Sequence, residues 1–177
     1  EIDRERVFLK KDEWYKDKNI ELLKGTRVEG LESSRKVVKL SSGDELGFEQ
    51  LLIAVGGYVN KLSVPGAGFG NILYLRTIDD ADSIIRASEK SRNAIVVGGG
   101  FIGLDMVCSF KKSGVEHVTV IVREPYFWYG KLDEVSSRIV TAVLERNGVR
   151  VVVNEEVSRF EGKNSSKVSD RQCQALD

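Results

Sequence analysis

The spacing of hydrophobic and polar residues changes along the chain and divides it into two parts. In the first third, short alternating runs predict β structure, with a hairpin that runs through Val37–Leu40, turns at a Ser-Gly-Asp sequence and returns through Leu46 and Phe48. The next run, Leu51–Gly57, is apolar without alternation, which is typical of a strand buried on both faces of a parallel sheet. A glycine-rich loop with Pro65 follows, and we interpret it as a crossover between domains.

The second part alternates between helical and strand patterns. Thr77 and Asp80 have the spacing of a capping box at the start of a helix over residues 77–91. Apolar strands are predicted within 93–97, 117–122 and 149–153, and amphipathic helices within 101–114 and 132–148. Three helices and three strands in alternation over about 90 residues predict an α/β fold with a Rossmann-like, doubly wound parallel sheet. The core-facing stripes expected on the last two helices are Ile102, Met106, Val107 and Phe110, and Ile139, Val140, Val143 and Leu144.

Composition and charge exclude several classes of function. The 27 basic and 27 acidic residues balance, which points to neither nucleic acid nor an anionic membrane surface. No apolar run reaches the roughly 20 residues of a membrane-spanning helix. Cys108, expected to be buried and inert, and Cys173 form no C-x-x-C pair, so neither a disulfide scaffold nor a dithiol redox centre is indicated. The sequence does not identify the compartment, and we expect a reducing intracellular one (cytoplasm, mitochondrion or plastid). His117 is the only histidine, so we expect neither a metal site nor a catalytic acid–base residue.

The candidate site is a glycine motif between a strand and a helix. Its spacing is Gly98-x-Gly100-x-x-Gly103, and the intervening candidates are Gly99, Phe101 and Ile102. In a dinucleotide site the first glycine permits a sharp turn, the second lets the main chain approach a pyrophosphate, and the third lets the helix pack on the sheet. The free N–H groups of the helix then face the phosphates. This context favours nucleotide binding over a tight structural turn in another α/β fold.

The choice of nucleotide depends on the end of the second strand, at Val122, Arg123 and Glu124. Glu124 lies about 20 residues beyond Gly103, where an acidic residue binds the ribose of NAD(H). Arg123 stands where an arginine pairs with the 2′-phosphate of NADP(H). Alternatively, both are solvated loop charges. We expect NAD(H), with NADP(H) as the alternative.

Several segments together resemble the FAD-dependent pyridine nucleotide-disulfide oxidoreductase superfamily, in its apoptosis-inducing-factor-like and monodehydroascorbate-reductase-like branches. The resemblance covers about residues 12–162. The segments that carry it are LLIAVGG (51–57), NILYLRTIDDAD (71–82), IVVGGGFIGLD (95–105) and GKLDEVSSRIVTAVLERNGVRVV (130–152). Two separated motifs at the family's spacing are more specific than either motif alone.

The resemblance implies a domain organisation and an activity. Residues 1–70 correspond to part of an FAD-binding domain with a β-meander, in which Ala54 and Gly56 belong to the A-T-G motif, and 71–163 to an inserted NAD(P)H-binding domain. The family's first glycine motif, which holds FAD, would lie before Glu1, and the chain is therefore interpreted as a piece of a longer protein. The implied reaction is hydride transfer from NAD(P)H to FAD and onward to an unidentified electron acceptor. The oligomeric state stays open, with a homodimer as one alternative.

The sequence also departs from the family pattern. Val55 replaces the threonine of the A-T-G motif, and Asp105 replaces a glutamate whose family role is a contact with the nicotinamide amide. A hairpin expected after Phe160 is missing, and the polar segment 164–177 is expected to be disordered or added in cloning. The aromatic residues within 125–130 either border the nicotinamide or pack in the core. A nucleotide-sensing regulatory module and a truncated inactive fragment remain alternatives to an enzyme.

Overall fold

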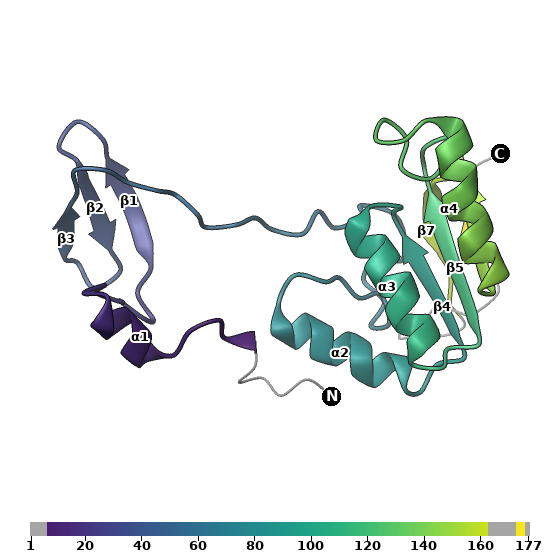
Figure 1. Cartoon of the computed structure of the whole chain (residues 1–177), viewed down its shortest axis with the longest axis horizontal. Coiled ribbons are helices and arrows are strands. Elements are labelled where there is room, and N and C mark those ends of the chain that lie inside the picture. The colour runs from purple at the N-terminus through teal and green to yellow at the C-terminus, as the bar shows by residue number, and fades with distance from the viewer. Residues whose placement is uncertain (1–6, 163–172, 176–177) are drawn as a thin grey trace. The chain divides into compact units, whose positions relative to one another are not determined.

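The computed structural model describes residues 7–162 and 173–175, and the chain separates into two compact units (Figure 1). The N-terminal unit is Glu1–Gly56 and the C-terminal unit is Gly57–Asp177. The division therefore falls inside the LLIAVGG segment. The assignment of residues 1–70 and 71–163 to two family domains remains a prediction.

The N-terminal unit is a three-stranded antiparallel meander. Its strands are β1 (Val28–Glu32), β2 (Val37–Leu40) and β3 (Glu45–Gly47), paired in the order β1-β2-β3. The predicted hairpin is thus confirmed, and Val38 and Leu40 are its buried residues. A short helix, α1 (Asp12–Asp17), precedes the meander. It buries no residue and therefore lacks the apolar periodicity by which a helix is predicted from sequence, so the sequence analysis missed it.

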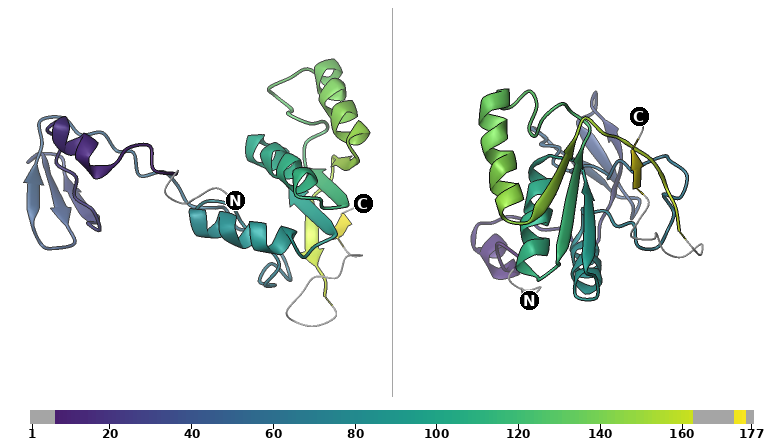
Figure 2. Two further views of the ribbon diagram at one scale, coloured as in Figure 1. Left: turned by 60° about the horizontal axis from the view of Figure 1, so that its bottom comes forward. Right: turned by 90° about the vertical axis from the view of Figure 1, so that its right-hand side faces the viewer.

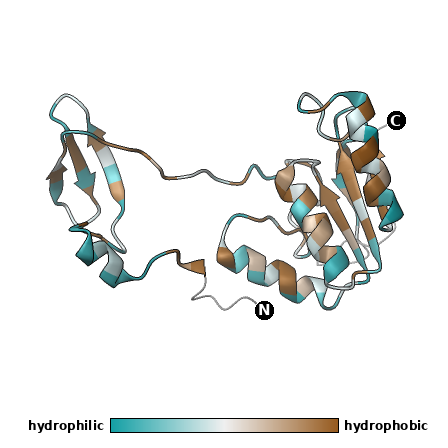
Figure 3. Ribbon diagram, viewed as in Figure 1, coloured by the Kyte–Doolittle hydropathy of each residue, from teal (hydrophilic) through white to brown (hydrophobic). Residues whose placement is uncertain are grey.

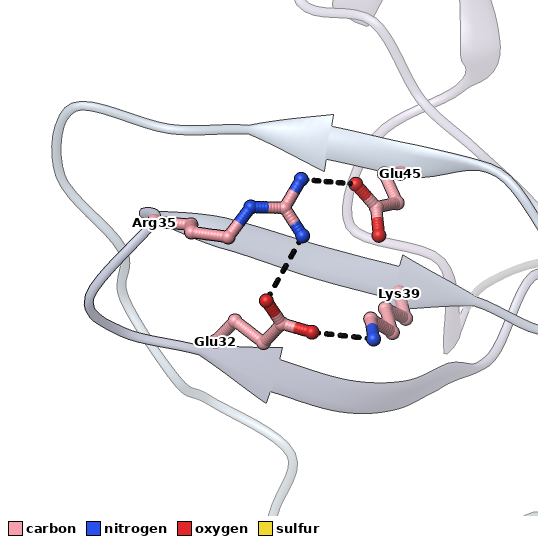
Figure 4. Close-up of polar contacts among 4 residues, drawn as sticks. All are labelled: Glu32, Arg35, Lys39 and Glu45. Atoms are coloured by element: carbon pink, nitrogen blue, oxygen red, sulfur yellow. Dashed lines mark hydrogen bonds and ion pairs between the residues drawn. The ribbon is translucent and has the colours of Figure 1, made fainter.

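Four charged side chains form a network across one end of the meander (Figure 4). Arg35 donates to Glu32 Oε2 and to Glu45 Oε2, each at 3.0 Å, and Lys39 pairs with Glu32 Oε1. Hydrogen bonds from Lys39, and next from Arg35, lower the pKa of Glu32 below its usual value, and the bond to Glu32 raises the pKa of Arg35. Because the pKa of Glu32 is lowered by folding, its contribution to stability is present above the usual glutamate range and is lost as the pH falls through the lowered value.

The segment Leu51–Gly57 does not form the buried strand that its apolar run predicted. It has no regular secondary structure, and Leu52 and Val55 are 87 % and 85 % exposed. A strand buried on both faces needs hydrogen-bonded neighbours along its edges and layers above and below. Among the described residues no strand pairs with this segment, so the prediction is wrong for this chain.

The C-terminal unit contains a parallel sheet of β4 (Asn93–Val97), β5 (His117–Val122) and β6 (Val149–Val153), in the order β4-β5-β6. Its helices are α2 (Ile78–Ser88), α3 (Phe101–Lys112) and α4 (Glu134–Arg146). Helices α3 and α4 lie on one face of the sheet, and the pair β7 (Val157–Phe160) and β8 (Cys173–Ala175) lies on the other (Figures 1 and 2). These layers confirm the Rossmann-like α/β fold.

The polar C-terminal segment is only partly described. Cys173–Ala175, within the segment expected to lack structure, pairs antiparallel with Val157–Phe160. The sequence analysis expected the family hairpin after Phe160 to be missing, and an antiparallel strand pair is present at this place. The expectation for the rest of 164–177 falls outside the described residues.

The hydrophobic core lies between the sheet and the two helices. Along the strands alternate residues face the helices, so that Val96, Val120 and Val151 lie side by side in the parallel register. Figure 3 shows the apolar colouring of these strands. The fully or nearly fully buried residues of this cluster are Val96, Val107, Val115, Val118, Val120, Val122, Phe127, Leu144 and Val149.

Most of the stripe residues expected on α3 and α4 face the core: Val107 and Leu144 are buried, and Met106, Phe110 and Val140 pack against the core cluster. Ile102, Ile139 and Val143 are more than half exposed, and Cys108 is exposed rather than buried. On α4 the core-facing positions include the fully buried Ser137. Because the polar Ser137 takes a place in the buried stripe of α4, the apolar residues alone indicated that stripe only in part.

Both capped helices begin as local chemistry requires. Thr77 and Asp80 form the predicted capping box, in which Asp80 N donates to Thr77 Oγ1 at 3.2 Å and Thr77 N donates to Asp80 Oδ2 at 2.8 Å. The hydrogen bond from Thr77 N to the Asp80 carboxylate lowers the pKa of Asp80. Asp133 caps α4 by accepting from Ser136 N at 2.8 Å, which lowers the pKa of Asp133.

The buried sheet residues should dominate the stability of the C-terminal unit. Val120 has no exposed surface, whereas Val135 on α4 is 72 % exposed. We expect Val120→Ala to lower the free energy of unfolding by about 2 kcal/mol, because it leaves a cavity in a close-packed core. Val135→Ala, the matched control, should change it by less than about 0.5 kcal/mol. Denaturant unfolding followed by circular dichroism measures both, and equal effects would contradict the assigned core.

Candidate functional site

The glycine motif forms a sharp turn between β4 and α3. Gly98 has φ of +113°, a conformation that residues with a Cβ rarely adopt. Its N–H donates to the carbonyl of Ile121 in β5 at 2.9 Å, so the turn is tied to the neighbouring strand. Gly100 is the N-cap of α3 and makes no side-chain capping bond. The chain therefore leaves the sheet and enters the helix within three residues.

Two of the glycines allow the helix and the strand to pack closely. A Cβ on Gly99 would lie 2.7 Å from Cγ2 of Val122, and a Cβ on Gly103 would lie 2.1 Å from the carbonyl oxygen of Gly98. Both distances are too short for real atoms. Gly99 and Gly103 thus have a packing role that the motif predicts for its third glycine.

Gly100 differs from these two because its surroundings are open. Apart from Gly100 itself and its chain neighbours, no heavy atom lies within 4 Å of the place that its Cβ would occupy. Open space beside bare main chain, at the start of a helix, suits a ligand that must approach the backbone closely. A dinucleotide pyrophosphate fits this observation.

The start of α3 favours an anion. Its first turn contains no acidic residue, and the N–H groups of a first helical turn have no partners within the helix. The side chains of Phe101 and Ile102 are mostly exposed beside this turn. Asp105 is exposed and lies beyond the first turn of α3.

The end of β5 places two opposite charges next to the glycine turn. Val122 is 1 % exposed and packs against Gly99. Arg123 and Glu124 follow, with Arg123 Nη2 lying 3.3 Å from Glu124 Oε1. The carbonyl of Glu124 accepts from Asn154 N at 2.9 Å, which ties this loop to the residue after β6. Arg123 and Glu124, the two residues expected to distinguish NADH from NADPH, thus lie at the same edge of the sheet.

The aromatic loop after β5 is held to the core and to α4. Phe127 is fully buried in the core, and its carbonyl accepts a hydrogen bond from Oγ of the buried Ser137 at 2.6 Å. Trp128 has φ of +60°, and its ring centroid lies 5.0 Å from that of Phe101. Of the aromatic residues in this loop, Phe127 therefore packs in the core, and Trp128 contacts the glycine motif. Ser137 was missed by sequence reasoning, because a serine in an amphipathic helix gives no signal of burial.

A hollow of about 440 Å³ lies elsewhere in the C-terminal unit. Arg76 lines it and donates from Nε to the carbonyl of Gly57 at 2.8 Å, and Lys61 lies over the ring of Tyr74. Sequence reasoning did not single out these cations. The full lining is Tyr58, Val59, Lys61, Ile72, Leu73, Tyr74, Arg76, Asp80 and Ser83.

Ala54 and Gly56, the candidates of the A-T-G motif, lie at the end of the N-terminal unit. Gly56 has φ of +70°, and Ala54 is exposed within the segment that forms no strand. The remaining candidates all belong to the C-terminal unit and gather around the glycine turn.

Two other kinds of site are not found in the part of the chain that the structure describes. Within residues 7–162 and 173–175, no three His, Cys, Asp or Glu side chains gather in a way that suits a metal ion. None of the helices described there is long and apolar enough to cross a membrane.

A parallel βαβ unit with a glycine turn at the carboxyl end of its first strand defines the class of dinucleotide-binding folds. The model of the pyridine nucleotide-disulphide oxidoreductase family matches residues 3–177. The chain belongs to this family.

Two curated relatives and one solved structure illustrate the similarity. The chain is 30 % identical to rubredoxin-NAD(+) reductase of Pseudomonas putida over 158 residues, 89 % of this chain and 41 % of that protein. It is 32 % identical to monodehydroascorbate reductase 2 of Arabidopsis thaliana over 174 residues, 96 % of this chain and 39 % of that protein. The reductase in a covalent putidaredoxin reductase–putidaredoxin complex superposes with a TM-score of 0.80 at 29 % identity, over 98 % of this chain and 41 % of that chain. The chain thus spans about two fifths of the length of the relatives it matches.

The different surroundings of the glycines give a matched pair of variants. Gly103→Ala should lower the free energy of unfolding by about 1–3 kcal/mol, because its Cβ meets main chain that cannot move away freely. Gly100→Ala should cost less than about 1 kcal/mol, because its Cβ enters open space and only a helix N-cap is changed. Thermal unfolding of both variants measures the difference. If Gly100→Ala were the more damaging of the two, the assigned packing of the turn would be wrong.

Proposed function

We propose that this chain is the nicotinamide-nucleotide-binding part of an FAD-dependent NAD(P)H oxidoreductase. The observation that carries the proposal is the glycine turn, where Gly99 and Gly103 are closed in by neighbouring atoms and Gly100 faces open space. A turn that only connected a strand to a helix would not need bare main chain on its open side. The family membership of the chain supports the same function.

The residues around the turn have separate roles in this proposal. The main chain of Gly99 and Gly100 and the first turn of α3 bind the pyrophosphate, while Phe101 and Ile102 flank it. Val122 closes the floor of the site by packing against Gly99. Asp105, being exposed on α3, is available for a polar contact with the nicotinamide end.

We propose NADH rather than NADPH as the preferred nucleotide. Glu124 accepts hydrogen bonds from a ribose hydroxyl, and its carboxylate repels a 2′-phosphate. The ion pair with Glu124 occupies part of the guanidinium of Arg123, which reduces its availability for a phosphate. Rubredoxin-NAD(+) reductase and the NADH:rubredoxin oxidoreductase of Clostridium acetobutylicum, with which the chain shares 27 % identity at a TM-score of 0.69, carry NAD in their names.

The proposal that FAD takes part is supported by the family membership and by only two candidate residues of this chain. Ala54 and Gly56 are the candidates from this chain for contacts with FAD. When both cofactors are bound, the reduced nicotinamide supplies a hydride and the flavin accepts it. The side chains of this chain bind and orient the nucleotide and exclude water, and no acid or base among them is required. The acceptor of the electrons is proposed only as a class: a small electron-transfer protein or an organic radical, as the names of the relatives suggest.

Thermal protection by NADH tests the nucleotide site directly. At a hundredfold excess over its Kd, a ligand stabilises the folded state by about 2.7 kcal/mol, so we expect the melting temperature to rise by several degrees. Gly100→Val should abolish this rise, because its side chain fills the space beside the main chain.

Gly47→Val is the matched control. Gly47 lies in β3 with no atom within 4 Å of its Cβ position, so this variant should keep the full response to NADH. The proposal fails if NADH and NADPH at millimolar concentration both leave the melting temperature of the natural chain unchanged.

Two substitutions separate the possible nucleotides. We expect Glu124→Ala to weaken NADH binding about tenfold, because the loss of a charged hydrogen bond costs about 1.5–3 kcal/mol. Arg123→Ala should leave the affinity for NADH nearly unchanged. Isothermal titration with NADH and NADPH measures both. A selective loss of NADPH binding in Arg123→Ala would reverse the proposed preference.

A further inference from the structure

Trp128 combines three features that a simple packing residue does not need. Its backbone adopts φ of +60°, which is unfavourable for a bulky side chain. Its ring contacts Phe101, the first residue of α3, with centroids 5.0 Å apart. Its indole Nε1 is shielded from solvent and has no hydrogen-bond acceptor in the described structure. These features occur together, beside the turn where the nucleotide is proposed to bind.

The unpaired indole N–H is the most informative of the three. A buried donor without an acceptor is unfavourable, because it has lost its bond to water and gained none in return. Indole has a donor and no acceptor, so only an oxygen or another acceptor can relieve this cost. A ligand that supplies an acceptor for the Trp128 N–H would therefore lower the energy of this side chain.

The surroundings of Trp128 are firm on one side. Its neighbour Phe127 is fully buried, with a ring centroid 5.6 Å from that of Trp128. The hydrogen bond from Ser137 to the carbonyl of Phe127 fixes the loop on α4. On the other side lies Phe101, which is 60 % exposed.

We infer that Trp128 is a nucleotide-contacting residue: its indole N–H donates to an oxygen of the ribose–pyrophosphate backbone of a bound dinucleotide. Because Nε1 has no solvent-exposed surface in this state, the ring turns away from Phe101 when the nucleotide binds. Trp128 thus adds a side-chain donor to a site that otherwise binds phosphate through main-chain N–H groups. This inference rests on the proposed nucleotide site and deepens it.

The chain offers a matched pair of substitutions, because its only tryptophans are Trp14 and Trp128. Trp128→Phe keeps an aromatic ring against Phe101 and removes the N–H, and Trp14→Phe is the control. The probe is ADP-ribose, which carries the pyrophosphate and both riboses of the dinucleotide but no nicotinamide. We expect Trp128→Phe to raise the Kd for ADP-ribose about tenfold by isothermal titration, and Trp14→Phe to leave it unchanged.

The melting temperature without ligand separates this role from simple packing. If Trp128 is a donor without an acceptor, Trp128→Phe should leave the melting temperature unchanged or raise it. If Trp128 only packs, Trp128→Phe should lower the melting temperature and leave the Kd unchanged, and that result overturns the inference.

A second measurement does not depend on changing Trp128. In Trp14→Phe, all tryptophan fluorescence comes from Trp128, and saturating ADP-ribose should shift its emission to longer wavelength as the indole leaves the apolar contact with Phe101. An unchanged emission spectrum at saturation overturns the inference. If the natural chain binds neither ADP-ribose nor NADH, the proposed function itself fails. If it binds both and Trp128→Phe binds equally well, only the role of Trp128 is refuted.

Discussion

The structure of the C-terminal unit depends on how closely the start of α3 packs against the ends of β4 and β5. A single Cβ at Gly103 would lie 2.1 Å from the carbonyl oxygen of Gly98, and one at Gly99 would lie 2.7 Å from Val122. This packing sets the position of the helix on the sheet. As a result the first turn of α3, with its unpaired N–H groups, projects from the carboxyl edge of the parallel strands.

The same packing organises the neighbouring loops. The end of β5 is held beside the glycine turn by Val122 and by the bond from Gly98 N to Ile121 O, so Arg123 and Glu124 emerge next to the motif. The aromatic loop that follows is anchored to α4 through Ser137. The candidate site is thus supported by α3, β5 and α4.

Much of this arrangement was predictable because it depends on local chemistry. The capping box of Thr77 and Asp80, the β-branched strands and the glycine turn each follow from neighbouring residues, and the structure has all of them. The exposed segment Leu51–Gly57 shows the limit of such reasoning. Its apolar residues predict burial, but burial of a strand requires partner strands, and none of the described strands pairs with this segment.

The sequence by itself determined the order of the helices and strands from α2 to β6, the place of the turn and the residue types at its edge, since these depend on spacing and on the missing side chains of glycine. Only the tertiary structure decided that Ile102, Ile139 and Val143 stay exposed, that Ser137 supports the aromatic loop, and that Trp128 contacts Phe101. These contacts join residues on different elements, and their geometry depends on how the helices are rotated on the sheet. Periodicity constrains that rotation to within about one residue, and the packing of side chains selects the final angle.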